Sequence, residues 1–260
     1  MTFEPSASQA QIDARQHAFD NQPDPTTLVS REEIRAALLD RHTAATQDKF
    51  DAAHVAICGC GGLGSTIAVA LTRIGVGHLH LIDFDRVDMT NLNRQQYFLK
   101  DLGQYKTEAL RSNLRQINPF IDITIDTVKV TDENVPTLFD NEDIICEAFD
   151  VPENKTMLVN AVLENLPDKK LVSASGMAGF RSSNLVNTRR VSKNFYFCGD
   201  GETAPVPGAG LMAPRVGVVA CHEANMITRL ILGRRRRLTA KRKHKRNCNC
   251  NRKLQRITRH

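Results

Sequence analysis

The chain has 260 residues, of which 41% are hydrophobic, and its formal net charge is +6. This length and composition allow one substantial core, so we expect one main domain with appendages. The sequence has no apolar run near the roughly 20 residues that span a bilayer and no signal-peptide pattern at its start, which argues against a membrane protein or a secreted one.

Two distributions refine this view. The seven cysteines, an odd number, are spread through expected strands and helices, which favours reduced thiols and a cytoplasmic location. Residues 234–260 hold thirteen Lys and Arg and no acidic residue, so residues 1–233 carry about −7. We interpret 234–260 as a basic, disordered tail; its alternative role is attraction to nucleic acid or an acidic partner, which we do not favour.

The chain begins with a polar segment, 1–27, that contains three prolines and is expected to be flexible. Ser30 followed by Glu33 is a capping-box pattern, which predicts the start of a helix. A second short helix is expected over 43–50, leading into the first strand. The main domain is therefore predicted to span residues 28–233.

The stretch 55–94 predicts a strand, a glycine-rich turn, a helix and a second strand. Its turn has G-x-G-x-x-G spacing with one additional glycine, formed by Gly59, Gly61, Gly62 and Gly64. Such a turn allows phosphate or ribose to approach the backbone. The second strand, 78–82, ends at Asp83, where a carboxylate can accept hydrogen bonds from ribose hydroxyls. The glycine spacing alone does not discriminate, because NAD, FAD and ATP proteins all use it.

The polar residues after the second strand discriminate better. Asp85 follows Asp83 closely, Asn91 and Arg94 lie in the next loop, and Lys106 comes shortly afterwards. A hydride-transfer site needs few cations, whereas nucleotidyl transfer needs several to stabilise charge on a triphosphate. These residues therefore favour a triphosphate site over a redox cofactor site.

The remaining elements predict an α/β fold. Helices are expected over 107–118 and 157–166, and strands over 121–125, 143–149 and 171–175. This alternation indicates a doubly wound, Rossmann-like, mostly parallel sheet that follows N-terminal helices. Asp150 ends the fourth strand as Asp83 ends the second, and ligands of such sheets bind at these ends.

Further along, Leu185-Val186 and 195–197 are predicted to form a strand pair, an antiparallel addition to the sheet. A flexible loop over 199–210 follows. A last helix is expected to begin at Pro214.

At this point the sequence resembles the ThiF-type sulfur carrier protein adenylyltransferases, relatives of MoeB and of the adenylation domain of ubiquitin-activating enzymes. The resemblance covers roughly residues 30–233 and rests on eight segments in order: GCGGLGS, LIDFDRV, TNLNRQ, GQYK, LRQINP, EAFD, SASGMAGF and GLMAPRVG.

The resemblance implies roles for these residues in an ATP- and magnesium-dependent reaction. The four glycines would form the ATP loop, and Asp83 would bind the ribose, with Asp85 close to the same site as either a metal contact or a local structural residue. Asn91, Arg94 and Lys106 would contact the phosphates. Asp150 would hold magnesium and position the α-phosphate, so Arg94, Lys106 and Asp150 are the expected catalytic residues.

The implied substrate is a small ubiquitin-like carrier protein ending in Gly-Gly, whose C-terminal carboxylate becomes an acyl-adenylate. The segments EAFD, SASGMAGF and FYFCGDGE resemble the ThiF branch of thiamine thiazole biosynthesis, so a ThiS-like carrier is expected. A homodimer is also implied, with an arginine from the N-terminal helices completing the partner's site; Arg31, Arg35 and Arg41 are the candidates.

The cysteines depart from the pattern of many family members. Those members bind structural zinc through two C-x-x-C pairs, whereas Cys58/Cys60 and Cys248/Cys250 are spaced C-x-C. We therefore predict no zinc. Some relatives place a reactive cysteine in the flexible loop, whereas Cys198 only borders that loop, so the sequence leaves open whether a cysteine forms a covalent intermediate.

Two alternatives remain. The same ATP site could serve a tRNA-directed dehydratase of the superfamily, with the basic tail as an RNA anchor. The chain could also be a non-catalytic nucleotide-binding scaffold subunit, although the joint presence of Arg94, Lys106 and Asp150 argues against it.

Overall fold

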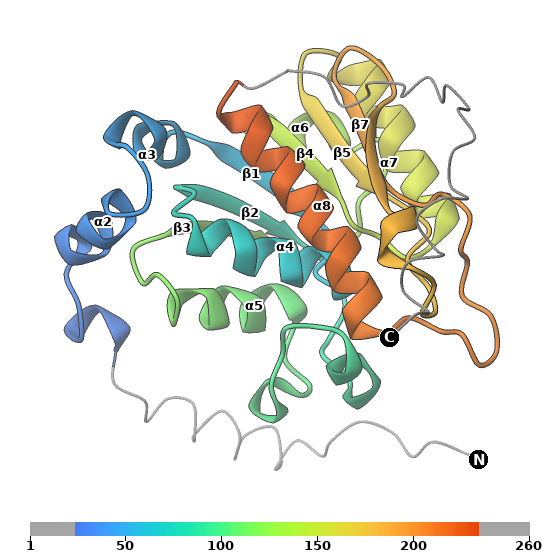
Figure 1. Ribbon diagram of the computed structural model, residues 1–260, viewed down its shortest axis with the longest axis horizontal. Helices are drawn as coiled ribbons and strands as arrows, with labels where there is room; N and C mark the ends of the chain where they lie inside the picture. The colour runs from blue at the N-terminus through green and yellow to red at the C-terminus, as the bar shows by residue number, and fades with distance from the viewer. Residues whose placement is uncertain (1–23, 234–260) are drawn as a thin grey trace, which may run out of the picture.

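A seven-stranded sheet with helices on both faces forms the centre of the molecule, as Figure 1 shows for the computed structural model, which describes residues 24–233. The strand order is β3-β2-β1-β4-β5-β7-β6, and every neighbouring pair is parallel except β6 with β7. The strands are β1 (His54–Cys58), β2 (His78–Ile82), β3 (Asp122–Asp126), β4 (Ile144–Glu147), β5 (Lys170–Ala174), β6 (Asn187–Arg190) and β7 (Phe195–Gly199). The predicted doubly wound, mostly parallel fold is confirmed.

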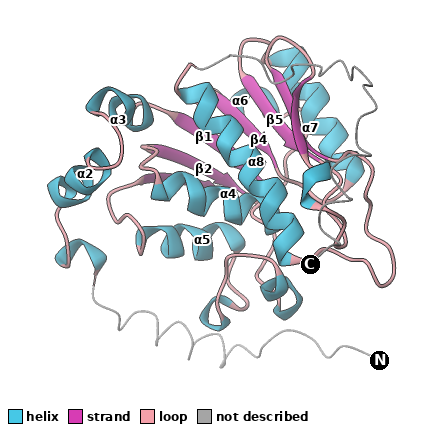
Figure 2. Ribbon diagram, in the orientation of Figure 1, coloured by secondary structure: helices cyan, strands magenta, loops and turns pink. Residues whose placement is uncertain are grey.

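Helices cover the two faces of this sheet unequally (Figure 2). One face packs against α4 (Gly62–Arg73), α5 (Lys106–Arg115) and the long α8 (Ala213–Ile231). The other face packs against α6 (Val135–Leu138) and α7 (Pro152–Asn165). The remaining helices are α2 (Arg31–Leu39) and α3 (Ala44–Asp51), and the 3-10 turns are η1 (Pro25–Thr27), η2 (Met89–Asn93), η3 (Leu99–Asp101) and η4 (Ser183–Leu185).

Strand β1 shows why the sequence forms a sheet buried on both sides. Val55 and Ile57 contribute to the core under α4 and α8, whereas Ala56 and Cys58 contribute to the core under α6 and α7. Successive side chains of a strand point to opposite faces, so a central parallel strand needs apolar residues at every position. The continuous apolar run in β1 satisfies this requirement.

The N-terminal helices begin as predicted. Ser30 accepts a hydrogen bond from the backbone N–H of Glu33, and the Glu33 side chain accepts one from the N–H of Ser30. This reciprocal pair satisfies two backbone donors that the first turn of α2 leaves open. The predicted capping box is therefore confirmed.

One predicted strand is wrong. Leu185 lies in η4 and is half exposed, and the antiparallel partner of β7 is instead β6, whose residues read Asn-Thr-Arg-Arg. An edge strand pairs on one side only, and this one is mostly exposed, so it needs no apolar alternation. The apolar pair Leu185-Val186 therefore led the sequence analysis to place the strand two residues too early.

Most of the predicted flexible segment 1–27 and the whole predicted tail 234–260 lie outside the described residues. Within residues 24–233, no helix has both the length and the hydropathy to cross a bilayer.

Candidate functional site

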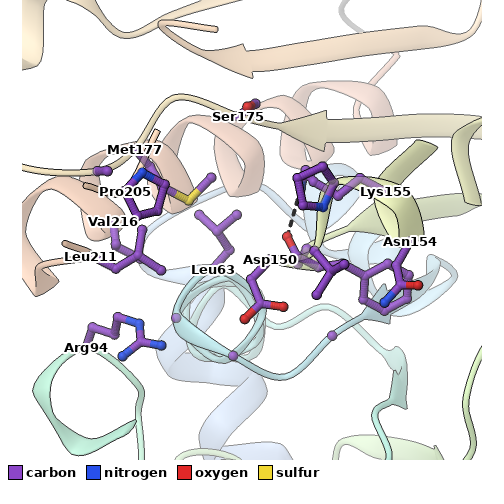
Figure 3. A pocket seen from close by; sticks show the side chains of 18 of the residues that line it. Leu63, Arg94, Asp150, Asn154, Lys155, Ser175, Met177, Pro205, Leu211 and Val216 are labelled. Carbon is purple, nitrogen blue, oxygen red and sulfur yellow. Dashed lines mark hydrogen bonds between the residues drawn. The ribbon is translucent and has the colours of Figure 1, made fainter. Parts of the chain in front are cut away.

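A large cavity lies where the sheet order reverses, between β1 and β4. Its volume is about 810 Å³, and it is lined by the segments that follow β1, β2, β4 and β5. Figure 3 shows Arg94 and Asp150 facing this space near the start of α4. A reversal point of this kind is where doubly wound sheets bind ligands. Of the residues predicted from sequence, the cavity brings together Gly59, Gly61, Gly62, Asp83, Asp85, Arg94, Lys106 and Asp150.

The glycine turn places the backbone of the α4 N-terminus against the cavity. Gly59 has φ of +94°, and a Cβ there would lie 2.9 Å from the carbonyl oxygen of Ala148. A Cβ on Gly64 would lie 1.8 Å from the carbonyl oxygen of Gly59, although Gly64 itself does not line the cavity. The turn must therefore be glycine-rich to fold. It also leaves the open N–H groups and positive dipole of α4 facing the cavity, where an anion is favoured.

Asp83 lies at the end of β2 and is 8% exposed. One carboxylate oxygen accepts from the N–H of Cys60 at 2.7 Å, and the other accepts from the N–H of Asp85 at 2.8 Å. Burial raises the pKa of Asp83, against the opposing charge of Lys106 and the two backbone donors. The carboxylate thus ties the glycine turn to the β2 loop while its residue lines the cavity.

Lys106 begins α5, and its ammonium lies 2.7 Å from a carboxylate oxygen of Asp85. The lysine is buried, whereas the Asp85 side chain is half exposed. Both residues line the cavity, so an arriving anion meets a cation that already has a carboxylate partner.

Arg94 and Asn91 are placed differently by the turn η2. The Arg94 guanidinium donates to Asn93 Oδ1 at 2.8 Å and to the carbonyl oxygen of Thr90 at 3.3 Å, both of which are neutral. Arg94 lines the cavity, and its positive charge remains available there. Asn91 is outside the lining; its side chain accepts from the N–H of Asp88 and caps η2.

Asp150 follows β4 and is exposed on the cavity wall. Among the described residues it has no hydrogen-bond or ion-pair partner. An ionised carboxylate without an internal partner next to a cavity is available to bind a cation or to interact with substrate.

The structure adds a lysine that the sequence interpretation missed. Lys155, in the first part of α7, donates to Glu147 Oε1 at 2.9 Å and to the carbonyl oxygen of Phe149 at 2.8 Å. Glu147 is fully buried and also accepts from Ser173 Oγ at 2.5 Å. The position of Lys155 near the start of a helix that follows Asp150 was a signal that could have drawn attention to it.

The loop after β7, which the sequence composition predicted, is anchored by a buried ion pair. Arg215 Nη2 lies 2.6 Å from Asp200 Oδ2, and Nη1 donates to the carbonyl oxygens of Arg181 and Ser182. Although burial of Asp200 acts in the opposite direction, hydrogen bonds from Thr203, Glu202 and Arg215 lower the pKa of Asp200 to about 2. The pair fixes the start of the segment that supplies Gly201 to Pro205 to the cavity wall.

Metal and thiol chemistry can be judged from the described residues. No group of three or more His, Cys, Asp or Glu between residues 24 and 233 is arranged to hold a metal ion. Magnesium needs less, because one or two carboxylates and substrate phosphates suffice, and Asp150 fits that role. Cys58 and Cys60 are buried, and Cys248 and Cys250 lie outside the described residues. Burial raises the pKa of Cys198 to about 12, which disfavours its reactive thiolate.

Comparison with known proteins gives a family match over most of the chain. The model of the ThiF family matches residues 34–259. The UBA4 adenylyltransferase and sulfurtransferase of Candida glabrata is 30% identical over 198 residues, covering 72% of this chain and 44% of that protein. The first relatives matched are longer proteins, of which this chain covers less than half.

Two further matches concern one enzyme of Escherichia coli. Its tRNA threonylcarbamoyladenosine dehydratase is 37% identical over 133 residues, covering 50% of this chain and 48% of that protein. The crystal structure of that dehydratase in complex with ATP aligns with a TM-score of 0.69 and 22% identity, covering 76% of this chain and 93% of that chain. The structural alignment supports the Rossmann-like fold.

Proposed function

The chain belongs to the ThiF family, and on this basis we propose that it is an ATP-dependent adenylyltransferase. The single observation that carries the proposal is the cavity at the start of α4, which combines an open helix N-terminus with Arg94, Lys106 and Asp150. A redox cofactor site would not need these charges, whereas a triphosphate does.

The proposed reaction is adenylation of the C-terminal glycine carboxylate of a small ubiquitin-like carrier. A carboxylate oxygen forms a bond to the α-phosphorus of ATP, the bond from that phosphorus to the β-phosphate oxygen breaks, and pyrophosphate leaves. Two anions must approach each other, so Arg94 and Lys106 would stabilise the charge on the phosphates. Asp83 would bind the ribose, and the glycine turn would hold the phosphates at the α4 N-terminus.

Asp150 would hold magnesium together with phosphate oxygens, and the metal would neutralise charge on the triphosphate. Asn91 is proposed to act indirectly, because its side chain caps the turn that carries Arg94. Asp85 is proposed to hold Lys106 in place until ATP binds.

We further propose that the carrier is ThiS-like, that the reaction belongs to thiamine thiazole biosynthesis, and that the enzyme is a homodimer. Segment 84–99 supports the homodimer, because four of its large apolar side chains are at least half exposed: Phe84, Met89, Phe98 and Leu99. Such a group of apolar side chains is suited to cover by a second subunit. Light scattering of the purified protein measures the oligomeric state.

Carrier-dependent exchange between ATP and labelled pyrophosphate tests the adenylation directly. We expect exchange with a ThiS-like carrier ending in Gly-Gly and none when the terminal glycine is removed. Absence of exchange with every carrier ending in Gly-Gly would exclude carrier adenylation. If the purified protein binds ATP yet never exchanges or consumes it, with its carrier or with modified tRNA, the scaffold alternative is correct.

A second candidate is a tRNA-directed, ATP-dependent dehydratase. It is supported by the 37% identity to the E. coli dehydratase and by the thirteen Lys and Arg of residues 234–260. This candidate predicts tRNA binding that weakens steeply with salt, because each phosphate contact releases counterions. ATP consumption that depends on modified tRNA rather than on a carrier would select it over the first proposal.

A further inference from the structure

The loop that carries Asp150 is held by a buried network centred on Lys155. The Lys155 ammonium donates both to Glu147 Oε1 and to the carbonyl oxygen of Phe149. The N–H of Phe149 donates to the same Glu147 oxygen at 2.8 Å, and Ser173 Oγ donates to the other one. Phe149 is therefore held through both its N–H and its carbonyl group.

This network fixes the backbone on both sides of Asp150. Phe149 precedes it, and on its other side the carbonyl oxygen of Val151 accepts from the N–H of Lys155 at 3.1 Å as α7 begins. Lys155 thus contacts the residue before Asp150 with its side chain and the residue after it with its backbone. Few degrees of freedom remain for the loop between these contacts.

The same network supports the glycine turn. Ala148 donates its N–H to the carbonyl oxygen of Cys58 at 2.8 Å, and the Ala148 carbonyl oxygen lies where a Cβ on Gly59 would meet it at 2.9 Å. A shift of the β4 loop would therefore change both the position of the Asp150 carboxylate and the packing against Gly59.

The environment of Lys155 does not suit direct phosphate binding. Its side chain is 16% exposed, and its charge is paired with a glutamate that is fully buried. Replacing that partner with a phosphate would leave the Glu147 carboxylate buried without a countercharge, which is strongly unfavourable. In Figure 3, Lys155 lies on the Asp150 side of the cavity view, away from Arg94.

We propose that Lys155 is a positioning residue for adenylation, which holds the Asp150 carboxylate in its reactive place through Glu147 and the Phe149 carbonyl group. The inference rests on the proposed function, because Asp150 matters only if the site transfers a nucleotidyl group. Misplacement of a reacting group by about 1 Å can cost on the order of 100-fold in rate.

The first experiment compares the wild type with Lys155→Met and with the double variant Glu147→Gln/Lys155→Met in the exchange assay. The double variant removes both charges together, so a folded protein is expected even if Lys155→Met alone does not fold. We expect kcat to fall about 10- to 100-fold in the double variant, with KM for ATP changed less than about threefold. Lys155→Arg, which keeps the charge and the donors, should recover part of kcat.

The second experiment repeats the comparison in an Asp150→Ala background. If Lys155 acts through Asp150, Glu147→Gln/Lys155→Met lowers exchange no further there. Lys169→Met is the matched control, because the Lys169 ammonium also donates to a carbonyl oxygen but lies outside the cavity lining. That variant should exchange at the wild-type rate.

The outcomes separate the two levels of proposal. If the wild type exchanges and the folded double variant has an unchanged kcat, the inference on Lys155 is overturned while the proposed function stands. A further full decline in the Asp150→Ala background, or a large rise in KM for ATP with kcat unchanged, assigns Lys155 to direct substrate contact and also overturns it. Absence of wild-type exchange with any carrier overturns the proposed function and this inference with it.

Discussion

Two cavities beside the sheet are similar in size, one of about 810 Å³ beyond the carboxyl ends of β1, β2 and β4 and another of about 740 Å³ on the α6 side of β1, β2 and β3. The second cavity also contains ionisable residues. His80 lies 2.8 Å from both Glu142 and Asp126, and His78 lies 2.9 Å from Asp122. Volume and charged lining therefore do not distinguish the two cavities.

The difference is how much of the charge is neutralised within the protein. In the α6-side cavity, His80 contacts two carboxylates at once. In the first cavity, Arg94 contacts only neutral oxygens, and Asp150 has no partner among the described residues. Removing one partner of a buried ion pair destabilises a fold because it leaves an uncompensated charge, whereas charges left for a ligand contribute to binding and catalysis at some expense of stability. We therefore expect substitutions in the two cavities to act on different measurements.

The largest expected effect is that of Asp150→Ala on carrier-dependent exchange. The rate should fall on the order of 100- to 1000-fold, since a group that stabilises the transition state is lost. The free energy of unfolding should change by less than about 0.5 kcal/mol, because the side chain is exposed. Asp168→Ala, another exposed aspartate, is the control. Near-wild-type exchange in Asp150→Ala would remove Asp150 from the mechanism.

His80→Asn should lower the free energy of unfolding and leave the exchange activity nearly unchanged, the opposite of Asp150→Ala. It removes hydrogen bonds to two carboxylates, so we expect a loss of about 1.5–3 kcal/mol in the free energy of unfolding at pH 6, measured by urea denaturation. Exchange by the folded variant should stay within about twofold of wild type. His78→Asn should cost less than about 1 kcal/mol, because its ion pair is exposed. A loss of activity without a loss of stability would contradict the comparison.

Gly59→Ala should affect both measurements, because Gly59 belongs to the fold and to the site. Its φ of +94° and the contact with Ala148 predict a loss of about 1–2 kcal/mol in stability, with weaker ATP binding by calorimetry. Gly217→Ala is the matched control: it lies within α8 with nothing near its added Cβ, so stability should rise slightly. If Gly59→Ala binds ATP with unchanged affinity, the glycine turn is not part of the ATP-binding site.

The smallest expected effect is a pH dependence. Burial opposes protonation of His80, but hydrogen bonds and charges from Glu142 and Asp126 outweigh it and raise the pKa of His80 above its ordinary 6.5. A raised pKa contributes stability that is complete below about pH 6.5 and is lost as the pH rises through the higher folded-state pKa. The stability difference between wild type and His80→Asn should therefore shrink from pH 6 to pH 8. If the stability difference instead grows from pH 6 to pH 8, the pKa of His80 is lowered rather than raised in the folded protein.

The sequence was informative wherever local patterns determine position. Parallel strands bring their carboxyl ends to one edge of the sheet, so placing Asp83 and Asp150 at strand ends was enough to predict that both lie at one site. The glycine spacing predicted the tight turn for the same local reason. Gly64 and Asn91 show the limit, since Gly64 packs against the backbone of Gly59 and the Asn91 side chain caps η2, and neither residue lines the cavity.

Features that depend on contacts between distant segments could not be predicted in this way. The buried Glu147 carboxylate of β4 accepts hydrogen bonds from Lys155 of α7 and from Ser173 of β5, so this network is complete only when the three elements come together. The pair of Asp200 with Arg215 likewise joins a loop to a helix that begins after it. Strand β6 is polar because it lies at the sheet edge, so it carried no apolar pattern.

The ion pair between Lys106 and Asp85 reduces the affinity that a ligand can gain from contact with Lys106. A molecule that binds at Lys106 must displace a carboxylate already 2.7 Å away, so only the difference between the two interactions contributes to affinity. An uncharged nucleoside gains nothing from this exchange, whereas a triphosphate brings more negative charge than the carboxylate it replaces. If a nucleotide binds at Lys106, as proposed, the pair would favour highly phosphorylated nucleotides over the nucleoside, independently of any contact with the base.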